Sequence, residues 1–204
     1  MDATLRLTRF LDPSVRQLLV AELFDDVQRY FLLHSFASHV RKRLLTVLVP
    51  ALRRRERVLL IAHSFGSIVA YDVLWMLSHL REYTSLHDRR VDTFVTLGSP
   101  LGDKVVKGHL LGWKYPLAQR YPANIRRWCN LSARGDVIAH DARVAGDFRP
   151  MRTHTPLERF EEYANLCTVY RGRDGAWNPH KLYGYLILPE LGRLIATTLR
   201  SSMR

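Results

Sequence analysis

The chain has 204 residues, of which 47% are hydrophobic and 25% are charged, and its formal net charge is +12. A chain of this length and composition can bury one sizeable core, which excludes an intrinsically disordered protein and favours a single domain over residues 1–204. The excess of basic residues favours anionic partners such as an anionic membrane surface. Nucleic acid is not an expected partner, because the basic clusters at 41–43, 53–57 and 89–90 contain no interleaved aromatic residues.

The first part of the chain, residues 1–56, is predicted to be helical. Residues 13–31 and 35–55 both have helix-type patterns, and Pro50 is expected to bend or end the second helix. The opening residues lack the apolar core of a signal peptide, and no stretch of the sequence reaches the length of a membrane span. A cytoplasmic location is therefore the default expectation.

A strand followed by a sharp turn and a helix is predicted at residues 57–75, RVLLIAHSFGSIVAYDVLW. The apolar run before Ser64 is typical of a buried parallel strand, and the pattern after it favours a helix. Ala62 and Gly66 are small residues placed two before and two after the serine, as a nucleophile elbow of the form Gly-x-Ser-x-Gly requires, except that Ala replaces the first Gly. An ordinary loop in which Ser64 caps the helix is the alternative.

Two later residues can complete a Ser, Asp and His arrangement with Ser64. A serine hydroxyl needs an imidazole to take its proton, and the imidazole needs a carboxylate to fix its tautomer. Asp136 follows a strand-like run that breaks at Gly135, and His180 lies in a loop after the strand-like run 166–170. Both positions lie beyond the carboxyl ends of predicted strands, where open parallel sheets place their sites.

Other polar residues are given structural or alternative roles. His140 and Asp141 are alternative members of the triad because they lie close to Asp136 in the sequence. His63 is expected to be a packed, hydrogen-bonded histidine, and Asp72 is expected to bond a neighbouring loop.

The remaining histidines and the two cysteines carry no expected chemistry. His79 and His87 are expected on the surface. Cys129 and Cys167 both fall in apolar strand-like runs and are expected to be buried free thiols. The histidines are scattered along the chain, so no metal site and no cofactor are expected.

The segment 102–124 lies between a second predicted strand, in VDTFVTLGSPLG at 91–102, and the strand-like run that breaks at Gly135, and it is rich in apolar and aromatic residues. Because loops at the carboxyl ends of parallel strands carry specificity, it is a candidate cap or substrate-pocket segment. The alternative is that its aromatic residues pack over the core.

Four segments in a fixed order resemble one family. They are AHSFGSIVAYDVL at 62–74, VDTFVTLGSPLG at 91–102, RWCNLSARGDVIAH at 127–140 and NPHKLYGYL at 178–186. Together they resemble lipase-like and esterase-like serine hydrolases of the α/β-hydrolase superfamily, and are similar to GPI inositol-deacylase-like and class 3 lipase-like enzymes. The resemblance implies an α/β fold with a mostly parallel sheet flanked by helices, with Ser64 as nucleophile, Asp136 as acid and His180 as base.

The chain departs from this family at the oxyanion site. Acyl transfer needs two amide donors, and the backbone N–H of Phe65 can supply the first. Residues 1–56 contain no predicted strand that ends in a His-Gly loop, so either the fold lacks its first strands or residues 32–38 supply the second donor.

The resulting hypothesis is a serine hydrolase that cleaves a small-molecule or lipid carboxylic ester through an acyl-enzyme and without a cofactor. The alternative is a catalytically impaired hydrolase-like module that binds a partner or an anionic membrane surface.

Overall fold

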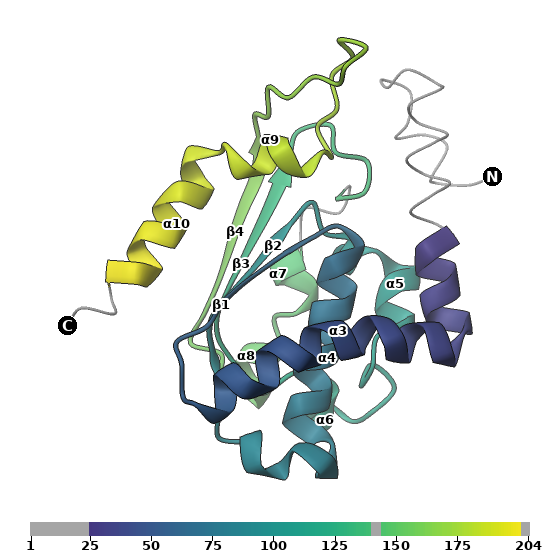
Figure 1. Ribbon diagram of the computed structural model, residues 1–204, viewed down its shortest axis with the longest axis vertical. Coiled ribbons are helices and arrows are strands. Elements are labelled where there is room, and N and C mark those ends of the chain that lie inside the picture. Colours follow the sequence, from purple (N-terminus) through teal and green to yellow (C-terminus); the bar gives the residue numbers. More distant parts are fainter. Residues whose placement is uncertain (1–24, 140–143, 201–204) are drawn as a thin grey trace.

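The computed structural model describes residues 25–139 and 144–200 and contains one four-stranded sheet. Every neighbouring pair of strands is parallel, and the strands lie side by side in sequence order (Figure 1). Their bounds are β1 Leu59–His63, β2 Val91–Leu97, β3 Ile125–Ala133 and β4 Arg159–Leu166. The expected α/β class with a parallel sheet flanked by helices is confirmed.

Helices cover both faces of the sheet (Figure 1). Helices α3 and α4 lie on one face, and α9 and α10 lie on the other. The helices are α3 His34–Arg53, α4 Phe65–His79, α5 Lys104–His109, α6 Leu117–Arg120, α7 Val144–Asp147, α8 Met151–His154, α9 Leu182–Leu186 and α10 Pro189–Arg200, with 3₁₀ turns at Arg81–Leu86 and Pro100–Gly102. Residues 25–32 are also helical.

The alternation of side chains along the strands builds two apolar layers. On the α4 side, Trp128 stacks on Phe160 with ring centroids 4.4 Å apart and packs against Phe94 at 5.3 Å. On the α10 side, the layer includes Val95 and Leu131. Because both faces are covered, most residues of β2 and β3 are buried, and the polar residues of β3 that are exposed or half-buried, Arg126 and Arg127, lie near its amino end.

The predicted strand at 166–170 is wrong, because β4 is Arg159–Leu166 and ends where the predicted strand begins. Strand β4 lies at the edge of the described sheet and carries charged residues, so its sequence lacks the apolar run of a buried strand. The expected burial of Cys167 is wrong for the same reason, since the residue lies in an exposed loop after β4. Cys129 is buried in β3 as expected, and its burial raises the pKa of the thiol to about 12.

Helix α3 continues through Pro50 and ends at Arg53, so Pro50 lies in its last turn. The sequence analysis expects Pro50 to bend or end this helix, and the structure shows that it does not end it.

The segment 102–124 connects the carboxyl end of β2 to the start of β3, and its aromatic residues contact the core. Tyr121 is buried, and the rings of Trp113 and Tyr121 both pack edge-on against Phe148. The indole of Trp75 in α4 donates a hydrogen bond to the carbonyl of Gln119 at 2.9 Å. These contacts describe a core-packing role for these aromatic residues, and a role in a cap or pocket stays a prediction.

Within residues 25–139 and 144–200, no helix combines the length and apolarity needed to cross a membrane. A cytoplasmic location stays a prediction.

A buried ionic network joins the helical layer. The Asp72 carboxylate of α4 accepts hydrogen bonds from the Tyr30 hydroxyl at 2.8 Å, the Arg41 guanidinium at 3.0 Å and the Leu111 amide at 2.8 Å. Burial raises the pKa of Asp72, and the charge and hydrogen bonds of Arg41 oppose that rise. The expectation that Asp72 bonds a neighbouring loop is confirmed by the Leu111 contact.

Replacing Asp72 with Ala is expected to lower the free energy of unfolding by about 3–5 kcal/mol, because it leaves a largely buried guanidinium without its carboxylate. Urea unfolding measures this change. The matched control is Asp88→Ala, which removes an exposed carboxylate paired with Arg89 and is expected to change stability by no more than about 0.5 kcal/mol. Equal effects of the two substitutions would contradict the role given to the network.

Candidate active site

Ser64 lies at the turn between β1 and α4, in a backbone conformation that serine rarely adopts. Its φ is 54° and its ψ is −130°, a positive-φ conformation whose strain is about 1–3 kcal/mol. The Ser64 amide donates to the carbonyl of Leu97 at 3.0 Å, which fixes the turn against the end of β2. Helix α4 starts at the next residue, so the predicted strand, turn and helix are all present.

Two further serines, Ser67 and Ser99, fix the turn from the helix side. The Ser67 hydroxyl donates to the Ser64 carbonyl at 2.6 Å and lies 2.7 Å from the Ser99 hydroxyl, which in turn accepts from the Leu101 amide. The proton of Ser67 goes to the carbonyl, so the Ser99 hydroxyl donates to Ser67. Sequence analysis missed these residues, because two serines far apart in the chain form no local pattern.

The three residues predicted for a triad lie within hydrogen-bonding distance of one another. His180 Nε2 is 2.8 Å from Ser64 Oγ, and His180 Nδ1 is 2.9 and 3.0 Å from the two carboxylate oxygens of Asp136. All three residues are buried. They come from three different strand ends, since Asp136 follows β3 and His180 lies in the loop after β4. The alternative triad members His140 and Asp141 lie outside the described residues.

Asp136 is held in an ionised, acceptor-only state. The Tyr185 hydroxyl donates to its Oδ2 at 2.6 Å, and the amides of Ile138 and Ala139 donate to its Oδ1 at 3.0 and 3.3 Å. Burial alone would raise the pKa of Asp136, but the hydrogen bonds and the charge of His180, with the Tyr185 bond, bring it below its ordinary value. An ionised Asp136 accepts the Nδ1 proton of His180 and leaves Nε2 free to accept the proton of Ser64.

Tyr185 is a positioning residue that sequence analysis missed. Its hydroxyl accepts from the Ala133 amide at 2.9 Å while it donates to Asp136, so it connects α9 to the end of β3. Burial and the charge of Asp136 raise its pKa, which keeps the hydroxyl a donor. A tyrosine five residues after a histidine is no recognisable signal by itself.

His63 holds the loop that carries His180. Its Nε2 donates to the carbonyl of His180 at 2.7 Å, and the two rings lie with centroids 4.8 Å apart. Burial and the neighbouring His180 lower the pKa of His63 to about 4. The expectation of a packed, hydrogen-bonded His63 is confirmed.

The lowered pKa of His63 predicts a loss of stability in mild acid. Between about 6.5 and about 4 the unfolded chain protonates His63 while the folded chain does not, so the free energy of unfolding falls as the pH falls through this range. Urea unfolding of the wild type and of His63→Gln across this range measures the difference, and the variant is expected to show a shallower fall. His87→Gln, which replaces an exposed histidine, is the control, and it is expected to follow the wild type.

The expected crowding at Gly66 is not found, and a different glycine, Gly98, lies in close contact with the site. A Cβ at Gly66 would meet no heavy atom within 4 Å, so the expected crowding at this position is absent from the described structure. Gly98, at the end of β2, has a φ of +54°, and a Cβ there would lie 2.8 Å from Asp136 Oδ2 and 3.2 Å from His180 Nδ1. The position that requires a small residue is therefore Gly98, which packs closely against the Asp136–His180 pair.

Gly98→Ala is expected to displace the Asp136–His180 pair and to lower the free energy of unfolding by about 1–2 kcal/mol, the strain of a left-handed residue with a Cβ. Urea unfolding and the NMR resonance of the His180 Nδ1 proton measure the two effects. Gly66→Ala is the control, since it adds a Cβ in open space within α4, and it is expected to leave that resonance in place. An unchanged resonance in Gly98→Ala would contradict the close packing.

The backbone N–H of Phe65, predicted as the first oxyanion donor, lies at the start of α4, and two amides of the segment predicted to supply the second donor are already engaged. Phe65 is the first residue of α4, so its N–H has no intrahelical acceptor. In the segment 32–38, the amides of Leu33 and Ala37 already donate to the carbonyls of Arg29 and Leu33.

The two histidines expected on the surface differ. His87 is exposed, whereas His79 is half-buried and its Nε2 lies 2.8 Å from the Tyr121 carbonyl. In the part of the chain that the structure describes, no group of three or more His, Cys, Asp or Glu residues could hold a metal ion.

Searches against protein-family models, curated proteins and solved structures returned no match. A function for this chain therefore has to be inferred from the site itself.

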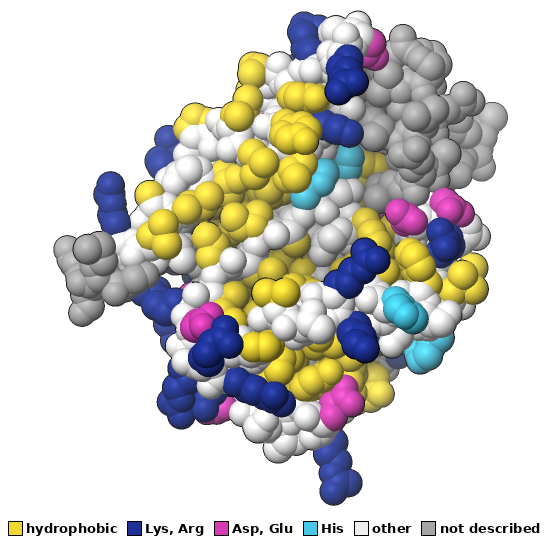
Figure 2. All heavy atoms as spheres, in the orientation of Figure 1, with side chains coloured by type: hydrophobic (Ala, Val, Ile, Leu, Met, Phe, Trp, Pro, Cys, Tyr) yellow, Lys and Arg dark blue, Asp and Glu magenta, His cyan; other side chains and the backbone are white. Residues whose placement is uncertain are grey.

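The surface beside the site is apolar (Figure 2). Helix α9 begins two residues after His180, and four of the large hydrophobic residues at 182–187 are exposed. We call them the α9 lip: Leu182 at 36%, Tyr183 at 58%, Leu186 at 50% and Ile187 at 62%. Figure 2 shows hydrophobic side chains gathered over α9 and α10 and bordered by basic side chains.

Proposed function

We propose that the chain is a serine hydrolase that cleaves a carboxylic ester. The observation that carries this proposal is the continuous set of hydrogen bonds from Ser64 Oγ through His180 to Asp136, at the tip of a strained strand-to-helix turn. A serine that only caps a helix needs neither an imidazole at its Oγ nor a carboxylate behind that imidazole.

The geometry supports a two-step acyl transfer. Ser64 Oγ attacks the acyl carbon, and its proton passes to His180 Nε2. The charge that develops on the acyl oxygen is stabilised by the Phe65 N–H at the start of α4. Collapse breaks the ester bond, and the alcohol leaves with the proton from His180. Water then attacks the acyl-enzyme with His180 as base, which releases the carboxylic acid and restores Ser64.

The order of the site residues supports an α/β-hydrolase type of fold. Ser64, Asp136 and His180 follow β1, β3 and β4 in that order, and each lies beyond the carboxyl end of a parallel strand. This is the arrangement that the sequence resemblance implies for lipase-like serine hydrolases.

The α9 lip supports an ester with an apolar acyl group or a lipid ester as substrate. Its exposed hydrophobic residues directly follow the residue proposed as base, so an apolar substrate that approaches His180 would cover them. Removal of such side chains from water stabilises a complex by about 25 cal/mol for each Å² that is covered.

The second candidate function is a catalytically impaired hydrolase-like module that binds a partner or an anionic membrane surface. Two amides of the segment predicted to supply the second oxyanion donor, those of Leu33 and Ala37, are already engaged, and loss of one oxyanion donor lowers the rate by about a hundredfold to a thousandfold. The net charge of +12 and the α9 lip, next to the exposed Lys181, fit an anionic lipid surface.

A fluorophosphonate probe tests the main proposal, because it forms a stable adduct only with an activated serine. We expect one adduct by intact mass on the wild type, none on Ser64→Ala, and a large loss in rate for His180→Ala and Asp136→Asn. Ser64→Ala is also expected to abolish hydrolysis of short p-nitrophenyl esters. The control Ser85→Ala, which removes an exposed hydroxyl, should react like the wild type.

The absence of an adduct on a folded wild-type chain would favour the second candidate. Co-sedimentation with vesicles of phosphatidylcholine, with and without phosphatidylserine, then tests the membrane version. We expect binding that needs phosphatidylserine and weakens as the salt concentration rises. Binding that depends on neither the anionic lipid nor the salt concentration would exclude a role in binding anionic membranes.

A further inference from the structure

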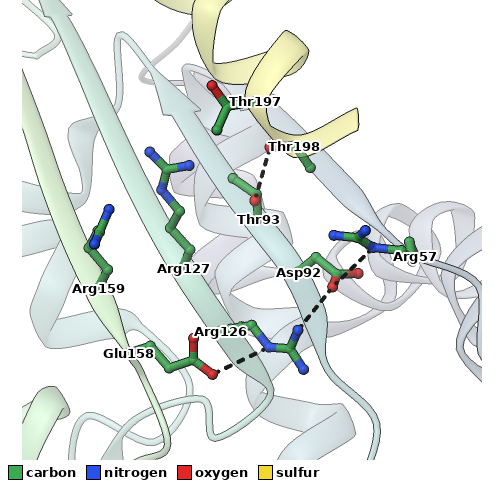
Figure 3. Close-up of a pocket in the computed structure, with 9 residues that line it drawn as sticks. All are labelled: Arg57, Asp92, Thr93, Arg126, Arg127, Glu158, Arg159, Thr197 and Thr198. Carbon is green, nitrogen blue, oxygen red and sulfur yellow. Dashed lines mark hydrogen bonds and ion pairs between the residues drawn. The ribbon is translucent and has the colours of Figure 1, made fainter. Parts of the chain in front are cut away.

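A cleft of about 700 Å³ lies on the α10 side of the sheet, near the amino ends of the strands. Figure 3 shows its side chains, which come from β2, β3 and β4, from the residues just before β1 and β4, and from the end of α10. The candidate active site lies beyond the opposite, carboxyl ends of the same strands. The cleft is therefore separate from Ser64 and does not depend on the proposed function.

Positive charge dominates the cleft. It is lined by four arginines, Arg57, Arg126, Arg127 and Arg159. The described lining holds two carboxylates, Asp92 and Glu158, both paired with Arg126, while Arg127 and Arg159 share Glu161 beside the cleft. One carboxylate that serves two guanidiniums leaves a local excess of positive charge.

The strand register forces two of these arginines together. Thr93, Arg127 and Arg159 are direct partners on β2, β3 and β4, so they form one row on the same face of the sheet. Like charges directly opposite each other on adjacent strands are destabilising unless an anion lies between them. Glu161 is the anion that both arginines reach, at 2.5 Å from Arg127 and 3.3 Å from Arg159.

Arg127 retains unused hydrogen-bonding capacity. Among the described residues, its Nε is buried and has no hydrogen-bond partner, and an unpaired buried donor destabilises a protein by about 1–3 kcal/mol. Arg159 projects from the neighbouring strand with its side chain 68% exposed (Figure 3). The row thus presents two guanidiniums that share one carboxylate, with the Thr93 hydroxyl on the strand beside them.

We propose that this cleft binds a phosphate group carried by a small polar molecule or by a lipid headgroup. Two oxygens of a phosphate accept two parallel N–H bonds from one guanidinium, and the negative charge of the phosphate complements the two arginines that share the single carboxylate Glu161. The cleft is larger than an inorganic phosphate needs, so the ligand is a phosphate ester whose remaining part occupies the space beneath α10.

The test compares free and membrane-bound phosphate esters on the full chain. Titration calorimetry with glycerol 3-phosphate measures the free ester, and co-sedimentation with phosphatidylcholine vesicles, with and without phosphatidic acid, measures the lipid. We expect at least one of the two to bind. Arg159→Gln is expected to weaken that binding roughly tenfold, as loss of one charge-assisted hydrogen bond does, and Arg127→Gln is expected to weaken it at least as much.

The control is Arg43→Gln, which removes the same charge from an exposed position on α3, across the sheet from the cleft. It is expected to leave the binding constant unchanged. Arg159→Gln keeps the proposal testable if Arg127→Gln unfolds, since the Arg159 side chain is largely exposed. Failure of both phosphate sources to bind, or equal losses in Arg43→Gln and Arg159→Gln, would overturn the proposal.

Discussion

The hydrogen bond between His180 and Asp136 is the interaction on which the candidate site depends. It joins the loop after β3 to the loop after β4 and fixes which nitrogen of the imidazole faces Ser64. A buried carboxylate is stable only when its oxygens are fully paired, and here the partners come from Tyr185 and from two backbone amides as well as from His180. The absence of a Cβ at Gly98 leaves room for this pair.

The sequence predicts the parts of this molecule that depend on local pattern. Strands β2 and β3 are largely buried between the two helical layers, and Ser64 follows the apolar run of β1 with helix-type spacing behind it. Strand β4 lies at the sheet edge and contains Arg159, Glu161 and Glu162, so its sequence has no apolar run, and the prediction places the strand at the next apolar residues instead. Tyr185, Ser67 and the partners of Asp72 could not be predicted, because their roles arise from contacts between segments distant in the sequence.

The two ends of the parallel sheet carry opposite kinds of polar chemistry. At the carboxyl ends, a carboxylate, an imidazole and a hydroxyl form a fully paired set that is buried. At the amino ends, arginines outnumber the carboxylates that serve them. The parallel arrangement contributes to this difference, because it places all the carboxyl ends of the strands at one edge of the sheet and all the amino ends at the other. Polar residues near the same end of several strands are therefore brought together.

Strand β1, which carries Ser64 at its end, pairs on one side only within the described sheet, and its Ile61 is 36% exposed. An apolar strand with an open edge is a template for pairing with another chain. Four of the five residues at 53–57, immediately before this strand, are arginines, and all five are exposed. Two copies that approached through this edge would bring these arginines together, and at low ionic strength their repulsion would oppose pairing through β1. Salt should weaken that repulsion.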